Sequence, residues 1–203
     1  MNNPIERIAL REVAAEDKFP QKKGFNIKKE LFEICEMAVF SIVTVVIIFT
    51  FLFRIVGVEG ASMQPGINGG DRLIISHLFY APKAGDVVVI QHKEFLVPII
   101  KRIIATEGQT IDVHPETGEV FVDGVLRNEP FIKELTRKIY SVTYPHTVAD
   151  GCVFVMGDNR NNSRDSREVG DIDVDSIIGK VMFRIFPKTG LAPFPYPERV
   201  EFE

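Results

Sequence analysis

The stretch from Met37 to Phe53, MAVFSIVTVVIIFTFLF, divides the sequence into two unequal parts. It contains no charged residue, no glycine and no proline. A helix over it spans about 25 Å, close to the roughly 30 Å hydrocarbon core of a bilayer. Continuing through Ile55, Val56 and Val58 closes the gap, provided that the Arg54 side chain reaches the headgroups. We therefore expect a membrane-spanning helix over residues 37–56; a buried core helix or a pair of strands is the alternative.

The flanks of this stretch indicate its orientation. The charged region of a signal peptide is a few residues long, whereas 36 residues precede this stretch and no A-x-A site follows it directly, which favours an uncleaved signal-anchor. Four lysines lie between residues 22 and 29, while Arg54 and Arg72 are the only basic residues in a similar window afterwards. This asymmetry predicts that residues 1–36 are cytoplasmic and that the rest is exported.

Charge and cysteine content exclude several classes of protein. Residues 1–36 hold seven basic and seven acidic residues, so the net charge of -4 belongs to the exported part. An acidic domain argues against a nucleic-acid partner. Cys35 and Cys152 would lie on opposite sides of the membrane, so we expect no intramolecular disulfide, and Cys152 is expected in the core. No Cys/His cluster has zinc spacing, so we expect neither metal nor cofactor.

Beyond the anchor, short β-branched runs alternate with turn dipeptides such as Gly85-Asp86. Asp123-Gly124 is a strong hairpin signal between Val120–Val122 and Val125–Leu126. The fold is therefore expected to be mainly β, a barrel-like antiparallel domain over residues 57–186, followed by an irregular proline-rich tail over 187–203. The expected strands are 72–75, 86–90, 99–104, 110–113, 119–122, 152–156 and 180–186.

Three polar features interrupt this domain, and the first is a serine loop. In Gly60-Ala-Ser-Met-Gln-Pro-Gly66, the Pro-Gly pair after Ser62 forbids a regular helix, so the segment is not the nucleophile elbow of an α/β-hydrolase. Taken alone, it is a surface loop that carries a serine.

The second feature is a pair of cations within the apolar run 98–104, PIIKRII. Strand alternation places Lys101 and Arg102 on opposite faces, each otherwise lined by isoleucine, so both cations are predicted to be buried. Burial lowers the pKa of a lysine, and a neutral lysine can accept a proton from a serine hydroxyl. The alternative is an edge-strand lysine whose amine reaches water.

The third feature is the loop Gly157-Asp-Asn-Arg-Asn-Asn-Ser-Arg-Asp-Ser-Arg167, which follows the expected strand 152–156. Alone it could be a solvated turn. Arg102 cannot discharge and needs a carboxylate partner. Asp158 and Asp165 are available for Arg102 and Arg167, and such paired groups can hold a site together.

Together these segments resemble the bacterial type I signal peptidases, membrane-anchored Ser-Lys endopeptidases that remove signal peptides from exported proteins. The resemblance runs from the anchor to about Phe186. Glycine at position 60 is typical of the Gram-positive-like branch of this family. The matching segments are residues 60–65, 70–75, 101–104 and 157–167, together with 121–124 and Glu129-Pro130.

The resemblance implies a mechanism. The serine that matches Ser62 is the nucleophile and forms an acyl-enzyme, and the lysine that matches Lys101 is the general base. Ser163 would hydrogen-bond to the Lys101 amine, and the Ser62 backbone N–H would bind the oxyanion. Some members add a hydroxyl two residues before the serine; Gly60 lacks it, a loss worth up to about 3 kcal/mol if nothing replaces it.

The resemblance also implies supporting pairs and substrate pockets. Asp158 would pair with Arg102 and Asp165 with Arg167, holding the last segment against the catalytic strand. Shallow pockets would accept alanine-like residues at −1 and −3. Their walls would be Val58, Met63, Ile67, Ile99 and Ile100.

Two departures from the family pattern bear on substrate preference. Gly66 stands where threonine is usual, and residues 105–109 are ATEGQ where G-x-P-G-D is usual. Both lie outside the proposed nucleophile and base.

The sequence thus predicts a cell-membrane endopeptidase that cleaves preproteins after A-x-A-like sites. Its expected partners are signal peptides, the bilayer and the secretion translocon, without nucleic acid, metal or cofactor. One alternative is a self-cleaving Ser-Lys repressor, which would be cytosolic. Another is a non-catalytic, membrane-tethered β-domain that binds exported chains, which would require a missing nucleophile or base.

Two weaker signals are rejected. Asp171-Ile-Asp-Val-Asp175 begins like a calcium loop, but Ser176 and Met182 replace the required Gly and Glu. The four histidines are scattered and are expected on the surface.

Overall fold

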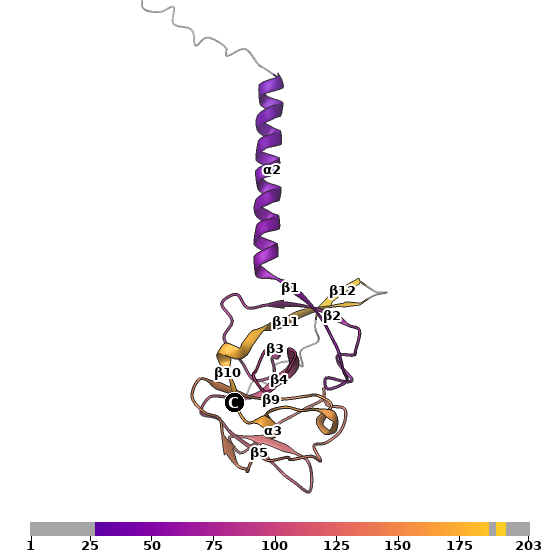
Figure 1. Cartoon of the computed structure of the whole chain (residues 1–203), viewed down its shortest axis with the longest axis vertical. Coiled ribbons are helices and arrows are strands. Elements are labelled where there is room, and N and C mark those ends of the chain that lie inside the picture. Colours follow the sequence, from indigo (N-terminus) through magenta and orange to yellow (C-terminus); the bar gives the residue numbers. More distant parts are fainter. Residues whose placement is uncertain (1–26, 187–189, 194–203) are drawn as a thin grey trace, which may run out of the picture. The chain divides into compact units, whose positions relative to one another are not determined.

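The computed structural model describes residues 27–186 and 190–193 (Figure 1). The chain divides into an N-terminal unit that ends at Ile47 and a second unit that begins at Ile48. The predicted cytoplasmic segment lies largely outside the described residues, as does most of the expected tail.

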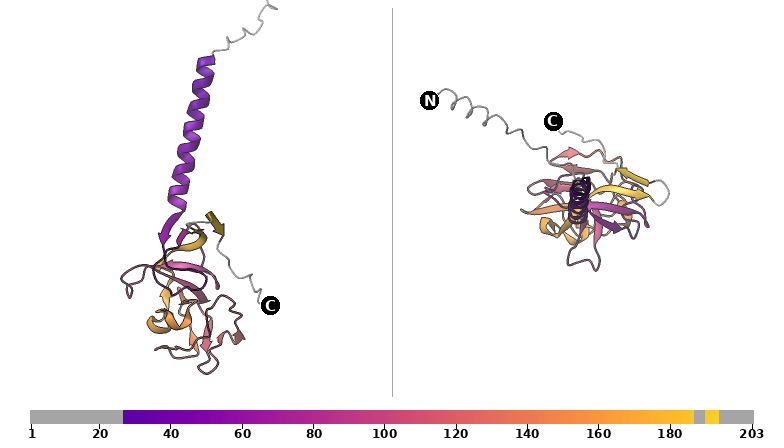
Figure 2. Two further views of the ribbon diagram at one scale, coloured as in Figure 1. Left: turned by 90° about the vertical axis from the view of Figure 1, so that its right-hand side faces the viewer. Right: turned by 90° about the horizontal axis from the view of Figure 1, so that it is seen from above.

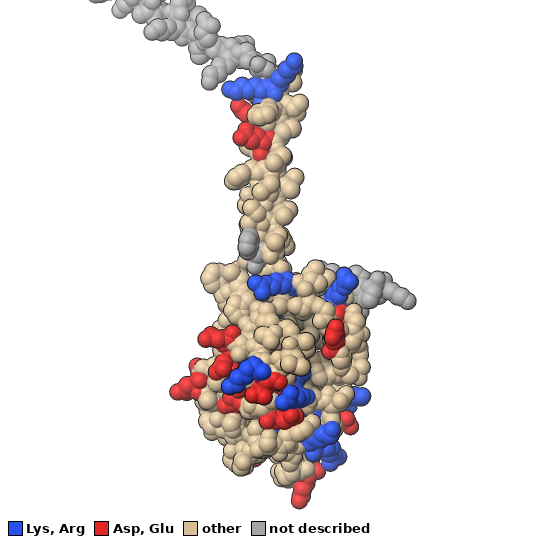
Figure 3. Space-filling view, in the orientation of Figure 1, with Lys and Arg blue, Asp and Glu red and all other residues tan. Residues whose placement is uncertain are grey.

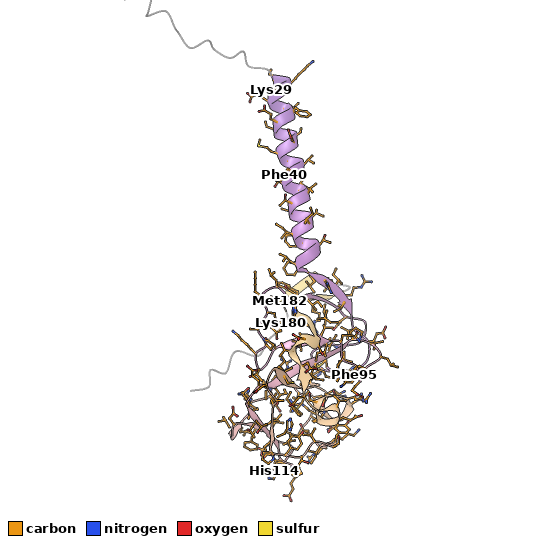
Figure 4. All side chains as sticks on the ribbon, turned by 60° about the vertical axis from the view of Figure 1, so that its left-hand side comes forward. Lys29, Phe40, Phe95, His114, Lys180 and Met182 are labelled. Carbon is orange, nitrogen blue, oxygen red and sulfur yellow. The ribbon has the colours of Figure 1, made fainter. Side chains whose placement is uncertain are left out.

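The N-terminal part is one long helix, α2 (Ile27–Leu52). By length and composition, residues 27–50 of this helix could cross a membrane. Figure 3 shows its charged side chains gathered at one end, and Figure 4 shows apolar ones such as Phe40 projecting from it. Phe40 is 74% exposed, and a helix that is apolar all round without protein cover fits a lipid environment.

The helix begins earlier and ends earlier than the sequence predicted. It includes the charged turns before Met37, because Lys and Glu are good helix formers. The prediction that the helix continues through Ile55, Val56 and Val58 is wrong, since β1 (Arg54–Gly57) pairs antiparallel with β2 (Arg72–Ser76). The β-branched Ile55 and Val56 find backbone partners in this ladder, which suits their strand preference.

The second unit is mainly antiparallel β, as predicted, and is built on a curled eight-stranded sheet (Figures 1 and 2). The strand order is β1-β2-β11-β3-β4-β9-β10, and β12 pairs with β11. The remaining strands are β3 (Val87–Ile90), β4 (Ile99–Thr106), β9 (Cys152–Met156), β10 (Ile172–Asp173), β11 (Ile177–Phe186) and β12 (Gly190–Pro193). The last long strand, β11, therefore lies between two strands from the beginning of the domain.

A smaller sheet has the order β7-β6-β5-β8, from β5 (Thr110–Val113), β6 (Val120–Val122), β7 (Val125–Leu126) and β8 (His146–Thr147). The predicted hairpin is confirmed, with Val122 opposite Val125. Asp123 and Gly124 both have positive φ, 53° and 78°, as a two-residue hairpin turn of type I′ requires. The short helices are η1 (Arg160–Asn162), α3 (Ser166–Val169) and η2 (Val174–Ser176).

Three other expectations need correction. Gly190–Pro193 form β12 instead of an irregular tail, because β11 offers them an edge to pair with. Cys152 is half-buried at the start of β9 and only borders the core. His92 is buried and His146 is bonded to Asp171, so these two histidines are not simple surface residues.

Candidate active site

The structure brings Ser62 and Lys101 together although 39 residues separate them. Ser62 lies in the turn-rich loop between β1 and β2, and Lys101 lies on β4. The Lys101 Nζ donates to Ser62 Oγ at 2.8 Å and to the Ile100 carbonyl at 3.0 Å. An amine and a hydroxyl at this distance can exchange a proton directly.

Lys101 is buried, as strand alternation predicted, and only 3% of it is exposed. This burial lowers the pKa of its amine from 10.5 to about 8. Among the neighbouring charges, Asp165 raises the pKa, Arg167 lowers it and Asp158 raises it. The neutral amine is therefore well populated near and above pH 8.

Arg102, on the opposite face of β4, forms the predicted pair with Asp158. Its Nε and Nη2 donate to the two carboxylate oxygens at 2.8 and 2.7 Å, and both side chains are buried. The Nη1 donates to the Gly85 carbonyl at 2.8 Å, and the Phe131 ring lies 4.0 Å from the guanidinium carbon. These contacts fix the polar segment after β9 against the strand that carries Lys101.

The second predicted pair, Asp165 with Arg167, is also present and fully buried. Arg167 donates through Nε and Nη2 to Asp165 at 2.8 Å each, and Asp165 accepts the Gly157 N–H at 2.9 Å. Arg167 also donates to the carbonyls of Lys138 and Arg160. The pair thus folds the loop 157–167 onto itself.

Gly157 lies where this loop meets the serine loop. A Cβ built at this position would lie 2.3 Å from Ser163 Oγ and 2.5 Å from the Ser62 carbonyl oxygen. Only glycine permits this approach. The next residues bind the serine loop directly, since the Asn159 N–H donates to the Ser62 carbonyl at 2.9 Å.

Ser163 differs from the prediction. Its hydroxyl is buried and has no hydrogen-bond partner among the described residues, so the expected bond to Lys101 is not formed here. The Lys101 amine instead uses Ser62 Oγ and its neighbouring carbonyl. Ser163 nevertheless lies beside Gly157, next to the serine loop.

Sequence reasoning missed two groups that brace the site. Arg160 is fully buried and donates to Glu129 at 2.5 and 2.7 Å and to Thr136 at 3.1 Å. Arg184 on β11 donates to the Gly66 carbonyl of the serine loop and lies 3.7 Å from Asp71. No local signal in the sequence singles out Glu129 as the partner of Arg160 or Gly66 as the partner of Arg184.

Four of the five expected pocket residues share one apolar cluster. Val58, Met63 and Ile67 are buried in it, and Ile100 packs against it, whereas Ile99 belongs to a different cluster. Val58, Met63 and Ile67 are at most 7% exposed, whereas Ile99 and Ile100 are only partly buried. Within the described part of the chain, no group of three His, Cys, Asp or Glu side chains is placed to hold a metal ion.

Comparisons with known proteins identify the family of this chain. Residues 31–186 match the family described as "Signal peptidase, peptidase S26". The chain is 34% identical over 178 residues to "Signal peptidase I" of Bacillus licheniformis, covering 82% of this chain and 95% of that protein. It is 34% identical over 160 residues to "Signal peptidase I T" of Bacillus subtilis, covering 73% and 82%.

Two further similar proteins come from bacteria outside the genus Bacillus. The chain is 41% identical over 138 residues to "Probable signal peptidase I-1" of Synechocystis, covering 62% of this chain and 67% of that protein. A crystal structure of a signal peptidase I from Enterococcus faecalis is 21% identical, with a TM-score of 0.38, and covers 50% of this chain and 97% of that one.

Proposed function

Because the chain belongs to the signal peptidase family, peptidase S26, we propose that Ser62 is its nucleophile and Lys101 its general base. As a member of this family, the chain is a serine endopeptidase that cleaves signal peptides. The observation that supports this pair is the 2.8 Å contact between the Lys101 Nζ and Ser62 Oγ. Membership of this family favours the signal peptidase over the two alternative functions, a self-cleaving repressor and a non-catalytic binding domain.

In the proposed acylation step, the neutral Lys101 amine takes the hydroxyl proton while Ser62 Oγ attacks the scissile carbonyl. The carbonyl electrons move onto oxygen, and the Ser62 backbone N–H stabilises the resulting oxyanion. As the intermediate collapses, the C–N bond breaks and the Lys101 ammonium protonates the leaving amine. The mature protein departs and the signal peptide remains as an ester on Ser62.

Deacylation repeats the proton transfers with water. The neutral Lys101 amine deprotonates a water molecule that attacks the ester, and the Ser62 alkoxide recovers its proton from the lysine as the signal peptide leaves. Ser163, whose buried hydroxyl lacks a partner among the described residues, is proposed to orient the amine during the cycle.

Burial is the main reason why the Lys101 ammonium is not held permanently, and the paired charges around it limit the opposing effect of two carboxylates. An unpaired carboxylate nearby would favour the charged lysine. Asp165 and Asp158 both raise the pKa of Lys101, and Arg167, which is bonded to Asp165, lowers it and so opposes part of their effect. We propose that this is the chief contribution of Arg167 to the reaction, besides holding the loop 157–167.

Substrate selection is proposed to depend on the apolar wall beside Ser62. Shallow pockets for small residues at −1 and −3 would be lined by Val58, Met63, Ile67, Ile99 and Ile100, of which all but Ile99 share one apolar cluster. Pockets of this kind select by excluding larger side chains, which allows many different preproteins to be cleaved. Gly66 and residues 105–109 would adjust this preference.

The apolar helix α2 is consistent with a membrane anchor, and the signal peptidase I family is membrane-bound. We propose a single span with residues 1–36 in the cytoplasm and the β unit outside. The four lysines between residues 22 and 29 support this orientation. The bilayer and the secretion translocon are then the proposed partners besides signal peptides.

The decisive experiment uses the full chain in detergent with a synthetic preprotein peptide that carries one A-x-A site. Mass mapping should find a single cut after the second alanine. Ser62→Ala and Lys101→Met should each lower kcat by about 10⁴-fold or more. Lys83→Met, at an exposed lysine, is the matched control and should leave kcat unchanged. Cleavage by Ser62→Ala at the normal rate would overturn the assignment.

A further inference from the structure

Asn159 contacts the serine loop on both sides of Ser62. Its side-chain Nδ2 donates to the Ala61 carbonyl at 3.0 Å, and its backbone N–H donates to the Ser62 carbonyl at 2.9 Å. Asn159 is only 3% exposed, and its own carbonyl accepts the Asn162 N–H at 2.9 Å. A buried asparagine, anchored through its backbone, therefore binds the peptide unit before the serine with its side chain and the one after it with its backbone N–H.

The first of these peptide units has a particular importance. The Ala61 carbonyl and the Ser62 N–H belong to the same trans peptide, and planarity makes the two groups point in opposite directions. A hydrogen bond that fixes the direction of the carbonyl therefore also fixes the direction of the N–H. It further polarises the peptide unit, which makes the N–H a better donor.

We propose that Asn159 is a positioning residue that aims the Ser62 backbone N–H at the oxyanion of the tetrahedral intermediate. This inference rests on the proposed function, in which that N–H binds the oxyanion. Asn159 acts through the Ala61–Ser62 peptide unit and does not touch the substrate.

The composition of the serine loop makes the orientation of the Ser62 N–H depend on groups outside the loop. Gly60 supplies no side-chain hydroxyl, and its φ of 87° lies in a region that glycine enters freely. Within the described residues, this loop has no place in a strand ladder, and the Ala61 carbonyl accepts two bonds, from the Gln64 N–H at 3.2 Å within the turn and from the Asn159 Nδ2 at 3.0 Å. The turn bond is the longer of the two and comes from the loop itself, so the Asn159 side chain supplies the restraint from outside the loop on the peptide unit that precedes Ser62 Cα.

The test compares Asn159→Ala and Asn159→Asp with the wild type, using the full chain in detergent. Each variant should lose about 10- to 100-fold in kcat, with KM for the A-x-A peptide changed less than threefold. Affinity for a peptide boronic acid should fall by a similar factor, because its tetrahedral adduct on Ser62 places an oxygen where the oxyanion forms. For Asn159→Ala, which adds no charge, the apparent pKa of the pH–rate profile should stay within about half a unit of the wild-type value. For Asn159→Asp it should rise if the new carboxylate ionises, so the pH criterion applies to the alanine variant alone.

Asn162→Ala is the matched control, because this asparagine lies three positions further on and is exposed. It should keep wild-type kcat and boronate affinity. Asn159 variants with wild-type kcat and boronate affinity would overturn the inference while leaving Ser62 and Lys101 as the catalytic pair. Variants whose KM, boronate affinity and pH midpoint all shift together would show a general loosening of the loop and would also overturn it. If Ser62→Ala were active, the proposed function itself would fail.

Discussion

The protonation of Lys101 predicts how strongly cleavage depends on pH. With a pKa of about 8, roughly one-tenth of the amine is neutral at pH 7 and about nine-tenths at pH 9. Without burial, Lys101 would have the ordinary lysine pKa of 10.5, and the neutral fraction of its amine at pH 7 would be about 300-fold smaller. The buried position therefore supplies about 3 kcal/mol toward the active form of the base at neutral pH.

The perturbation is a change of pH from 6 to 10, and the assay is kcat/KM for a fluorogenic A-x-A peptide in detergent. Cleavage should rise about tenfold from pH 7 to 9, with a slope of one on a logarithmic scale below the midpoint. Single-turnover measurements would establish that the chemical step is being followed.

Two results would refute this reasoning. A midpoint above pH 10 would mean that the amine is not desolvated in the working enzyme. A flat profile between pH 6 and 9, with chemistry limiting the rate, would mean that Lys101 is not the base. Circular dichroism across the same range serves as the control for unfolding.

Three further predictions concern stability and packing. Because burial lowers the pKa of Lys101, the folded chain binds fewer protons than the unfolded chain between about pH 8 and 10.5, and the wild type is destabilised below that range. In urea unfolding at pH 7, Lys101→Met should therefore be more stable than the wild type by up to about 3 kcal/mol. This gain should vanish by pH 11. Equal gains at both pH values would contradict this. Asp158→Ala should lower the free energy of unfolding by about 3–5 kcal/mol in the same assay, because Arg102 is left buried and unpaired. Adding Arg102→Met to this variant should restore most of the lost stability; no recovery would argue against the ion pair as the cause. Gly157→Ala should lower kcat by at least about tenfold, since its Cβ would displace the Ser62 carbonyl, whereas exposed Gly124→Asn should not; wild-type kcat in Gly157→Ala would disprove the close approach.

Much of the fold follows from local patterns. The hairpin at Asp123-Gly124 has its turn chemistry in two adjacent residues, and β9 is a continuous apolar run. The burial of Lys101 and Arg102 follows from alternation along one strand, because a strand with isoleucine on both faces must be covered on both.

The features that were missed depend on distant parts of the chain. Residues 54–57 have the composition of a continuing membrane helix, and only the presence of β2 as a partner makes them a strand. The pair of Arg160 with Glu129 crosses 31 residues, and the contact of Arg184 with Gly66 crosses 118. Local sequence carries no information about such separations, so these braces had to come from the tertiary structure.

The place of β11 in the sheet has a consequence for the timing of activity. The serine loop precedes β2, and Lys101 lies on β4, which pairs with β3. In the sheet that the structure describes, β11 (residues 177–186) lies between β2 and β3 and is hydrogen-bonded to both. A growing chain that has already emerged as far as Lys101 still lacks the strand that joins the two halves of its dyad, and the braces from residues 157–167 as well. If the β unit is exported as proposed, we expect the nascent protein to remain inert until nearly all of that unit has crossed the membrane. The order of synthesis would then keep an incomplete protease from cleaving neighbouring chains.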